Sequence, residues 1–438
     1  MYRKVFEYLR NWKEDKYRKP LIVEGARQVG KTYAVLEFGK EEYDNVAYFN
    51  FQTNGKLADT FSEDISPSYL IPVLSHISGQ TITKGRTLIV FDEVQLCERA
   101  LTSLKYFKEE APEYHVIAAG SLLGVAVNRE KYAFPVGKVD RLIMHPMDFE
   151  EFLIALGEEE LARRIRTCYE KDEQMPSALH DIALGIYRKY LAVGGMPEAV
   201  ARFVDTGDFV QTRHVLETVS MDYLDDMSKY QDSAAEIAKT RLTYGTVAVQ
   251  LSKKNKRFQY KLIKKGGRAA EFENAMEWLD SANLIHLVYR VETIKKPLEN
   301  YRDIDDFKVY LSDMGLLCAQ KGISAQDVLF MESELEDFKG GMTENYVFTQ
   351  FVCAGFKPFF WRNEKGTSEV DFILSIGGKI VPVEVKSGEN VRSDSLNAYI
   401  RLFDPAWAIR ISEKNFGFEN KIKSVPLYAV FCIPNEPS

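Results

Sequence analysis

Short apolar runs alternate with helix-like segments over the first third of the chain. Five of these runs have the length of strands: Leu21–Val23, Val46–Phe51, Thr87–Phe91, His115–Ala119 and Arg141–Met144. Alternation of this kind is typical of parallel strands connected by helices. The pattern therefore predicts an α/β domain with a parallel sheet over residues 1–146.

Helical periodicity continues after the predicted sheet. Residues 147–235 carry apolar residues at spacings of three and four, which is typical of amphipathic helices. Gly194 and Gly195, followed by Met196 and Pro197, interrupt one of these helices and start a new turn. We predict a helical lid over this range.

The remaining residues show two further patterns. Residues 236–305 run as a helix, a basic segment, a helix and a strand, which is the order of a winged helix-turn-helix. Residues 306–438 run as a strand and turn, a long helix that begins near Met342, and several strand-like segments with one helix among them. These patterns predict a winged-helix-like domain and then a compact α/β domain.

A phosphate-binding loop follows the first predicted strand. Its residues complete the pattern G-x-x-x-x-G-K-[ST]: Gly25, Ala26, Arg27, Gln28, Val29, Gly30, Lys31 and Thr32. The two glycines permit backbone angles that point consecutive N–H groups at phosphate oxygens. Lys31 supplies positive charge to the β- and γ-phosphates, and the Thr32 hydroxyl is a ligand for Mg²⁺. A predicted helix continues through Tyr33, and its positive end adds to the anion site.

Two carboxylates follow the third predicted strand, in the segment TLIVFDE. Asp92 at the strand end is expected to hold Mg²⁺, and Glu93 is expected to orient and polarise an attacking water. The alternative is that the two acids only begin a solvated turn. Ser121, after the fourth strand, is expected beside the γ-phosphate, although it would equally serve as the cap of a following helix.

The sequence does not decide which residue serves as an arginine finger. Arg129 and Arg141 are candidates, and Lys138 is a weaker one because lysine lacks the planar fork of a guanidinium group.

A second group of candidate residues lies near the C-terminus. Glu384 and Lys386 alternate along one strand and therefore face the same side, and Asp371 lies on a strand joined to it by a turn at Gly377-Gly378. Two carboxylates and a lysine suit a divalent cation and an activated water for phosphodiester attack, and Glu344 on the preceding helix is a further ligand candidate. The alternative is a solvent-facing side of a strand.

A basic segment runs from Lys253 to Arg268 and contains no acidic residue. Its density of lysine and arginine, interleaved with Phe258 and Tyr260, suits contact with DNA phosphates. The helix that follows is acidic, which favours the alternative of a solvated loop; its acidic residues are Glu271, Glu273, Glu277 and Asp280.

Length and composition limit the number of domains and the classes of protein to which the chain can belong. At ~150 residues per domain, 438 residues suggest about three domains. A net charge of −7 argues against a chain that is basic throughout. The five cysteines are scattered without metal-ligand spacing, and the longest apolar stretch is about a dozen residues, short of a membrane span. The chain begins without a signal peptide, so we expect a soluble, cytoplasmic protein with no membrane contact.

The segments GARQVGKT, TLIVFDE, AAGSLLG and LAVGGMPEAV resemble prokaryotic AAA-type ATPases, which are related to archaeal and STAND-like P-loop ATPases. The C-terminal half, with SEVDF and PVEVKSG, resembles the domain that accompanies them, a winged helix with a restriction-endonuclease-like module of the PD-(D/E)xK type. The resemblance implies ATP and Mg²⁺ at the phosphate loop and at Asp92 and Glu93. It also implies that Asp371, Glu384 and Lys386 occupy the positions of a nuclease's catalytic residues.

Two hypotheses follow. In the first, Mg²⁺-dependent ATP hydrolysis drives a DNA-contacting winged helix and nuclease-like module. In the second, ATP controls a switch or scaffold whose degenerate module binds a protein partner. A small-molecule kinase fits less well, because it has no use for a carboxylate that positions a hydrolytic water. A homo-oligomer, in which neighbouring chains complete the site, stays open.

Overall fold

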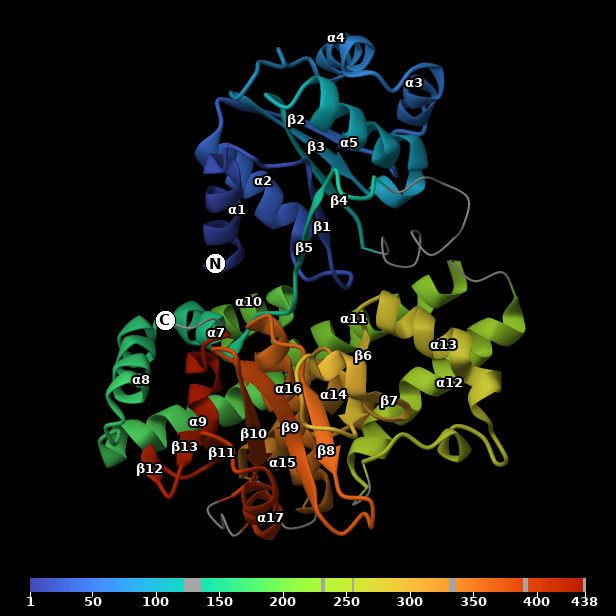
Figure 1. Cartoon of the computed structure of the whole chain (residues 1–438). Coiled ribbons are helices and arrows are strands. Elements are labelled where there is room, and N and C mark those ends of the chain that lie inside the picture. Colours follow the sequence, from blue (N-terminus) through green and yellow to red (C-terminus); the bar gives the residue numbers. More distant parts are fainter. Residues whose placement is uncertain (122–134, 230–232, 254–255, 331–335, 389–392, 436–438) are drawn as a thin grey trace. The chain divides into compact units, whose positions relative to one another are not determined.

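The computed structural model describes residues 1–121, 135–229, 233–253, 256–330, 336–388 and 393–435 (Figure 1). The chain divides into two compact units. The first contains Arg3–His145 together with Ser281–Asn283, and the second contains Met1–Tyr2, Pro146–Asp280 and Leu284–Ser438. Each unit has its own sheet, so the two are described separately.

The first unit is built on a five-stranded parallel sheet. Its strands are β1 (Leu21–Glu24), β2 (Asn45–Asn50), β3 (Thr87–Asp92), β4 (His115–Ala119) and β5 (Asp140–Ile143). They lie in the order β2-β3-β4-β1-β5, and every neighbouring pair is parallel. The α/β fold and the five strands expected from the apolar runs are therefore confirmed.

Helices complete the first unit, and side chains from both faces of β3 are buried. These helices are α1 (Val5–Glu14), α2 (Lys31–Glu42), α3 (Leu57–Glu63), α4 (Pro67–Ser78) and α5 (Glu98–Glu110). Phe91 on β3 lies in a cluster of aromatic rings and packs edge-on against Phe61 of α3 and Phe107 of α5. Continuous apolar strands such as LIVF are explained by this burial on both faces.

The strand order determines where chemistry is located in this unit. Because β4 lies between β1 and β3, the carboxyl ends of these three strands are neighbours at one edge of the sheet. In an open parallel sheet, ligands bind outside the carboxyl ends of the strands. The phosphate loop after β1, the acids at the end of β3 and Ser121 after β4 all lie at this edge.

The second unit combines a helical region with a mixed sheet. The described α-helices that precede its first strand in the sequence are α7 (Phe149–Ala155), α8 (Glu159–Lys171), α9 (Ser177–Val193), α10 (Pro197–Thr206), α11 (Phe209–Lys229), α12 (Ala234–Leu251) and α13 (Ala269–Ser281). Asp148 begins α7 with a reciprocal capping box with Glu151. The segments predicted as a lid (147–235), a winged helix (236–305) and a nuclease-like domain (306–438) all contribute to this one unit. Their division into separate domains stays a prediction.

The mixed sheet has the order β12-β13-β11-β10-β9-β8-β6-β7. The strands are β6 (Ile285–Val291), β7 (Arg302–Leu311), β8 (Phe359–Arg362), β9 (Glu369–Ile376), β10 (Lys379–Val385), β11 (Ala408–Ser412), β12 (Gly417–Glu419) and β13 (Ile422–Pro426). The antiparallel hairpin of β9 and β10 turns at Gly377-Gly378, both with positive φ, as expected from the sequence.

Helices α14 (Met314–Lys321), α15 (Ala325–Phe330), α16 (Glu336–Cys353) and α17 (Asp394–Phe403) accompany this sheet. Strands β10 and β11 are parallel and α17 connects them, which is the expected β-α-β arrangement. Between α12 and α13, the only regular secondary structure among the described residues is the short 3-10 helix η2 (Tyr260–Leu262). The antiparallel pair β6–β7 is where a wing was expected, and it joins the mixed sheet at β8.

A close backbone contact at Gly195 explains how the helical region packs against the rest of its unit. A Cβ at Gly195 would lie 2.1 Å from the Met147 carbonyl oxygen, and the Gly195 N–H donates to Asp313 at 2.6 Å. Asp313 also caps α14, since it accepts from the Leu316 N–H. The interruption predicted at Gly194-Gly195 lies between α9 and α10 and is a close contact with the C-terminal half of the chain.

This contact generates a stability prediction. In Gly195→Ala the added methyl group clashes with the Met147 backbone. We therefore expect this substitution to destabilise the second unit by about 1–3 kcal/mol. The matched control is Gly185→Ala in α9, where a Cβ meets nothing within 4 Å and alanine stabilises a helix by about 0.5–1 kcal/mol. Calorimetric unfolding of both variants tests the contrast. Equal stabilities would contradict this account of the interruption.

Candidate functional site

The phosphate loop has the backbone geometry that its glycines predict. Gly25 has φ +134°, and a Cβ there would lie 2.1 Å from the Met144 carbonyl oxygen. Gly30 has φ +89° and forms the N-cap of α2, and Gln28 also has a positive φ of +64°. The loop is therefore held in a conformation that alanine at Gly25 would disrupt through both its φ and a backbone clash.

The Lys31 ammonium group lies over the loop itself. It donates to the carbonyl oxygens of Gly25 at 3.0 Å and Ala26 at 2.7 Å, and its side chain is buried. Burial lowers the pKa of Lys31 to about 8, although the negative charges of Glu93 and Asp92 act in the opposite direction. Its hydrogen-bond partners among the described residues are neutral carbonyl oxygens, so this buried ammonium group gains stabilisation when an anion approaches.

Asp92 and Thr32 lie together, as the sequence predicts. The Thr32 hydroxyl donates to both carboxylate oxygens of Asp92, at 3.2 Å to Oδ1 and 3.1 Å to Oδ2. A hydroxyl and a carboxylate within this distance are hard oxygen ligands of the kind that Mg²⁺ prefers. The chemistry of these donors therefore fits a magnesium ion held by Thr32 and Asp92.

Two residues that sequence reasoning missed also hold Asp92. The Tyr48 hydroxyl donates to Asp92 Oδ2 at 2.7 Å, and the Asn50 side-chain amide donates to the same oxygen at 3.3 Å. Both lie on β2, and the parallel register pairs Asn50 directly with Asp92. The available signal was two polar residues alternating near the end of an apolar strand.

Glu93 has a distinct local conformation. Its φ is +52°, which is uncommon for a residue with a side chain, and its N–H donates to Asp92 Oδ1 at 3.0 Å. Gln95 in the 3-10 helix η1 (Val94–Leu96) donates from Nε2 to Glu93 Oε2 at 2.5 Å. The carboxylate of Glu93 is thus directed by its own backbone and by a neighbouring amide.

The other predicted residues of this site have varied surroundings. Ala26 and Val29 are buried, Arg27 and Ser121 are half-buried, and Tyr33 is 56% exposed on α2. The buried guanidinium group of Arg3 donates to the Val29 carbonyl oxygen at 3.0 Å, which ties the loop to the start of the first unit.

The finger candidates are engaged elsewhere or lie beyond the described residues. Arg141 donates to both oxygens of the buried Glu24, at 2.9 and 2.7 Å. Lys138 forms an ion pair with Glu109 at 2.9 Å. Arg129 lies outside the described residues, so the identity of the finger stays a prediction.

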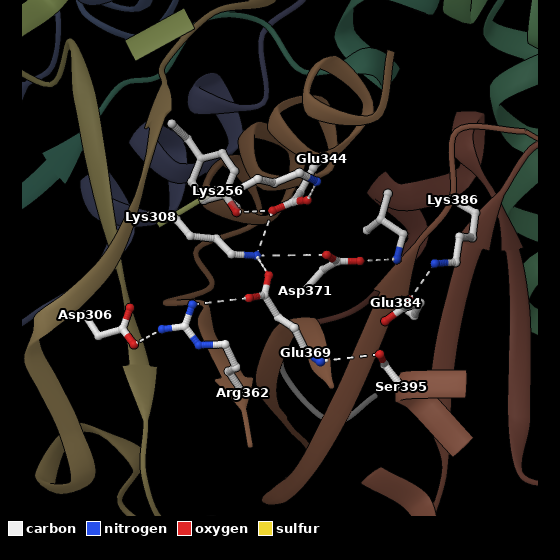
Figure 2. A network of polar contacts seen from close by, with 12 residues as sticks. Lys256, Asp306, Lys308, Glu344, Arg362, Glu369, Asp371, Glu384, Lys386 and Ser395 are labelled. Carbon is white, nitrogen blue, oxygen red and sulfur yellow. Dashed lines mark hydrogen bonds and ion pairs between the residues drawn. The ribbon is translucent and has the colours of Figure 1, made fainter. Parts of the chain in front are cut away.

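The C-terminal candidates come together around one point of the mixed sheet (Figure 2). Lys386 donates to Glu384 Oε1 at 2.7 Å, and Asp371 on the neighbouring strand accepts from the Val385 N–H at 2.8 Å. Glu344 enters from α16 and is 1% exposed. All four predicted residues therefore contribute to one cluster, which we call the acid cluster.

Lys308 on β7 was not predicted, and it lies among these carboxylates (Figure 2). Its fully buried ammonium group is 3.0 Å from Glu344 Oε1, 2.6 Å from Glu369 Oε1 and 3.9 Å from Asp371 Oδ1. Lys256 pairs with the other oxygen of Glu344, and the Tyr310 hydroxyl donates to Glu344 Oε1 at 2.5 Å. The signal in the sequence was one lysine within the apolar strand FKVYL.

The electrostatics of the acid cluster reflect this pairing. Burial opposes ionisation of Glu344, but Lys256 and Lys308 outweigh it and lower the pKa of Glu344. Burial and the charges of Glu344 and Glu384 raise the pKa of Asp371 well above its usual range. The pKa of Lys308 is raised because Glu344, Glu369 and Asp371 outweigh its burial. In the part of the chain that the structure describes, no three acid, thiol or imidazole groups are arranged to hold a metal ion.

The basic segment is partly paired with acids. Lys256 contacts Glu344, as described above. Arg257 lies 3.5 Å from Asp306, and Lys264 lies 3.0 Å from Glu271. Four other basic residues of the segment are exposed: Lys253, Lys261, Lys265 and Arg268. Lys254 lies outside the described residues.

The aromatic residues of the basic segment have a structural role. Phe258 is buried and stacks on Phe307, and Tyr260 packs edge-on against Phe258. Phe258 is therefore part of the core and Tyr260, which is half-buried, packs against it.

The five cysteines are not joined in disulfides; four of them are buried and Cys353 is half-buried. None of the helices that the structure describes has both the length and the apolar character needed to cross a bilayer.

Comparison with protein families divides the chain into three matched segments. Residues 17–153 match the family described as an AAA domain. Residues 184–327 match a domain of unknown function (DUF8612), and residues 339–430 match another (DUF4143). Residues 17–153, which carry the parallel sheet and the phosphate loop, thus match an AAA-type P-loop domain, and the two later segments match domains without assigned function.

Two solved structures that the chain matches have low sequence identity and low TM-scores. The Aeropyrum pernix ORC2 protein, in ADPNP–ADP complexes, is 12% identical with a TM-score of 0.35; the match covers 75% of this chain and 92% of that one. The Aeropyrum pernix ORC1 protein in complex with DNA is 11% identical with a TM-score of 0.27; the match covers 75% and 91%. The comparison with curated proteins gave no significant match.

The lowered pKa of Lys31 generates a pH prediction. At pH 8.5 roughly three quarters of the Lys31 side chains are neutral in the free protein, because their pKa is about 8. A bound triphosphate raises this pKa, so we expect MgATP binding to take up most of a proton at pH 8.5 and close to none at pH 6.5. The affinity for ATP therefore falls as the pH rises above 8.

Titration calorimetry in buffers of different ionisation enthalpy measures the uptake. Lys31→Arg is the control, because arginine stays protonated across this range. Equal proton uptake at both pH values in the wild type would contradict the assignment.

Proposed function

We propose that this chain is a Mg²⁺-dependent ATPase whose nucleotide cycle acts on a DNA-contacting, nuclease-like C-terminal unit. The observation that carries the ATPase proposal is the contact of Thr32 with Asp92 beside a phosphate loop whose Lys31 is buried and held by neutral carbonyls. In a sheet with this strand order, these groups lie at the edge where ligands bind.

Each residue has a distinct part in this proposal. The loop from Gly25 to Lys31 holds the phosphates, and Thr32 and Asp92 hold the magnesium ion, with Tyr48 and Asn50 orienting the Asp92 carboxylate. A bound Mg²⁺ supplies neutralisation of the charge on the β- and γ-phosphates. Glu93 accepts a proton from the attacking water, and Ser121 donates to the γ-phosphate.

DNA contact is proposed for the exposed part of the basic segment. Lys261, Lys265 and Arg268 are exposed, and their charges suit the sequence-independent binding of phosphates. Lys256 and Arg257 are excluded from this role because each pairs with a buried carboxylate.

The proposal predicts ATP turnover that requires Mg²⁺ and rises when DNA is added. Lys31→Ala removes the charge that binds the triphosphate, and Glu93→Gln removes the proton acceptor, so we expect each to lower kcat at least about 100-fold. Glu93→Gln is expected to retain ATP binding. Turnover and binding are measured separately, with and without double-stranded DNA.

Charge reversal at Lys261, Lys265 and Arg268 is expected to abolish the stimulation while leaving the DNA-free rate unchanged. Turnover that is indifferent to DNA in the wild type would contradict the coupling to DNA. Absence of Mg²⁺-dependent turnover would contradict the ATPase itself.

Lys308 favours a second candidate function, a nucleotide-controlled switch whose nuclease-like module does not cleave and binds a protein partner. The ammonium group of Lys308 contacts three carboxylates and so offsets part of the negative charge that would attract a divalent cation. A module of this kind keeps the fold of a nuclease and leaves its surface for binding.

This candidate predicts that Mn²⁺ does not stabilise the acid cluster. In a Lys31→Ala background, which weakens the loop site, we expect Mn²⁺ to leave the thermal midpoint of the second unit unchanged. Lys308→Met removes a cationic partner that three carboxylates share and destabilises the second unit by about 3–5 kcal/mol, and Mn²⁺ then restores part of this loss. In the control Glu344→Gln/Lys308→Met, one of these carboxylate charges is removed as well, and the Mn²⁺ effect shrinks. DNA cleavage by the wild type that is lost in Lys386→Ala would contradict this candidate.

A further inference from the structure

Gln95, at the ATPase site, has one side-chain atom paired and one unpaired among the residues that the structure describes. Gln95 is 9% exposed, and its Nε2 donates to Glu93 Oε2 at 2.5 Å. The other polar atom of the same amide, Oε1, is buried and accepts no hydrogen bond from a described residue. A buried amide oxygen left without a donor costs about 1–3 kcal/mol, so its persistence calls for a physical reason.

The geometry of the amide places this oxygen beside Glu93. The amide group is planar, so fixing Nε2 on one carboxylate oxygen also fixes Oε1 a short distance from that carboxylate. The Glu93 carboxylate and Gln95 Oε1 are both hydrogen-bond acceptors, so one water molecule can donate a hydrogen bond to each.

The backbone holds both groups in place. Glu93 has a left-handed φ where β3 leads into η1, and its side chain meets that of Gln95 in the hydrogen bond described above. Lys31 lies close enough to Glu93 to feel its charge. The pair therefore belongs to the same edge of the sheet as the phosphate loop.

We propose that Gln95 is a second water-positioning residue of the ATPase, an inference that rests on the proposed function. Its Nε2 orients Glu93, and its Oε1 accepts one hydrogen of the attacking water while the Glu93 carboxylate accepts the other. The water oxygen then presents a lone pair to the γ-phosphorus. The new O–P bond forms, the bond from phosphorus to the β,γ-bridging oxygen breaks with its electrons going to ADP, and Glu93 takes the water's proton.

The test compares Gln95→Met, which keeps the shape and removes both hydrogen-bonding groups, with the wild type. We expect kcat to fall about 10- to 100-fold, because the nucleophile is misplaced. The dissociation constant for MgATP is expected to change less than twofold, because Gln95 contacts no group assigned to phosphate or Mg²⁺. Gln174→Met, an exposed position in the other unit, is the matched surface control and should leave both quantities unchanged.

A double-mutant comparison separates positioning from a structural role. If Gln95 acts with Glu93 on one water, then Glu93→Gln/Gln95→Met is no slower than Glu93→Gln alone. A Gln95→Met enzyme with wild-type kcat overturns the inference, and so does one that loses ATP binding in step with turnover. ATP turnover of the wild type is measured before any variant is made. Absence of turnover in the wild type would contradict the ATPase proposal itself.

Discussion

Burial of charge is the constraint on which both acid-rich sites of this chain depend. An ion moved out of water must regain its lost hydration from partners in the protein. Lys31 and Lys308 are both buried, but their partners differ. Lys31 has two neutral carbonyl oxygens and a pKa lowered to about 8, whereas Lys308 has three carboxylates and a raised pKa. The first lysine gains from an incoming anion, and the second is already compensated.

The fold provides these two environments through strand order. In the first unit, β4 separates β1 from β3, so the loop after β1 and the acids after β3 meet across an edge that Thr32 and Asp92 bridge. In the second unit, three separate elements, β7, β9 and α16, bring Lys308, Glu369 and Glu344 to one buried point. The strand ends of the first unit lie at a sheet edge of the kind where ligands bind, whereas the side chains of Lys308 and Glu344 in the second unit are each 1% exposed.

The difference in position also explains what the sequence could predict. The phosphate loop is a contiguous pattern, and the acids follow an apolar strand, so local order was sufficient to find Lys31, Thr32, Asp92 and Glu93. Glu384 and Lys386 were found by alternation along a strand. Lys308 and Tyr310 were missed because their partner, Glu344, is more than 30 residues away, as the two contacts show. Tyr48 and Asn50 were missed for the same reason, since only the β2–β3 register brings them to Asp92.

Some basic residues of the segment form ion pairs with buried carboxylates, and this pairing limits their binding to DNA phosphates. Asp306 is buried and is shared by Arg257, Arg290 and Arg362, and Arg362 also lies 3.8 Å from Glu369. The pairs therefore continue from Asp306 through Glu369 to the acid cluster (Figure 2). A cation that leaves this network to bind a phosphate takes one partner away from a buried carboxylate, which then loses part of the compensation for its desolvation. Among the described residues of the basic segment, any DNA affinity is therefore expected from those outside the network: Lys253, Lys261, Lys265 and Arg268.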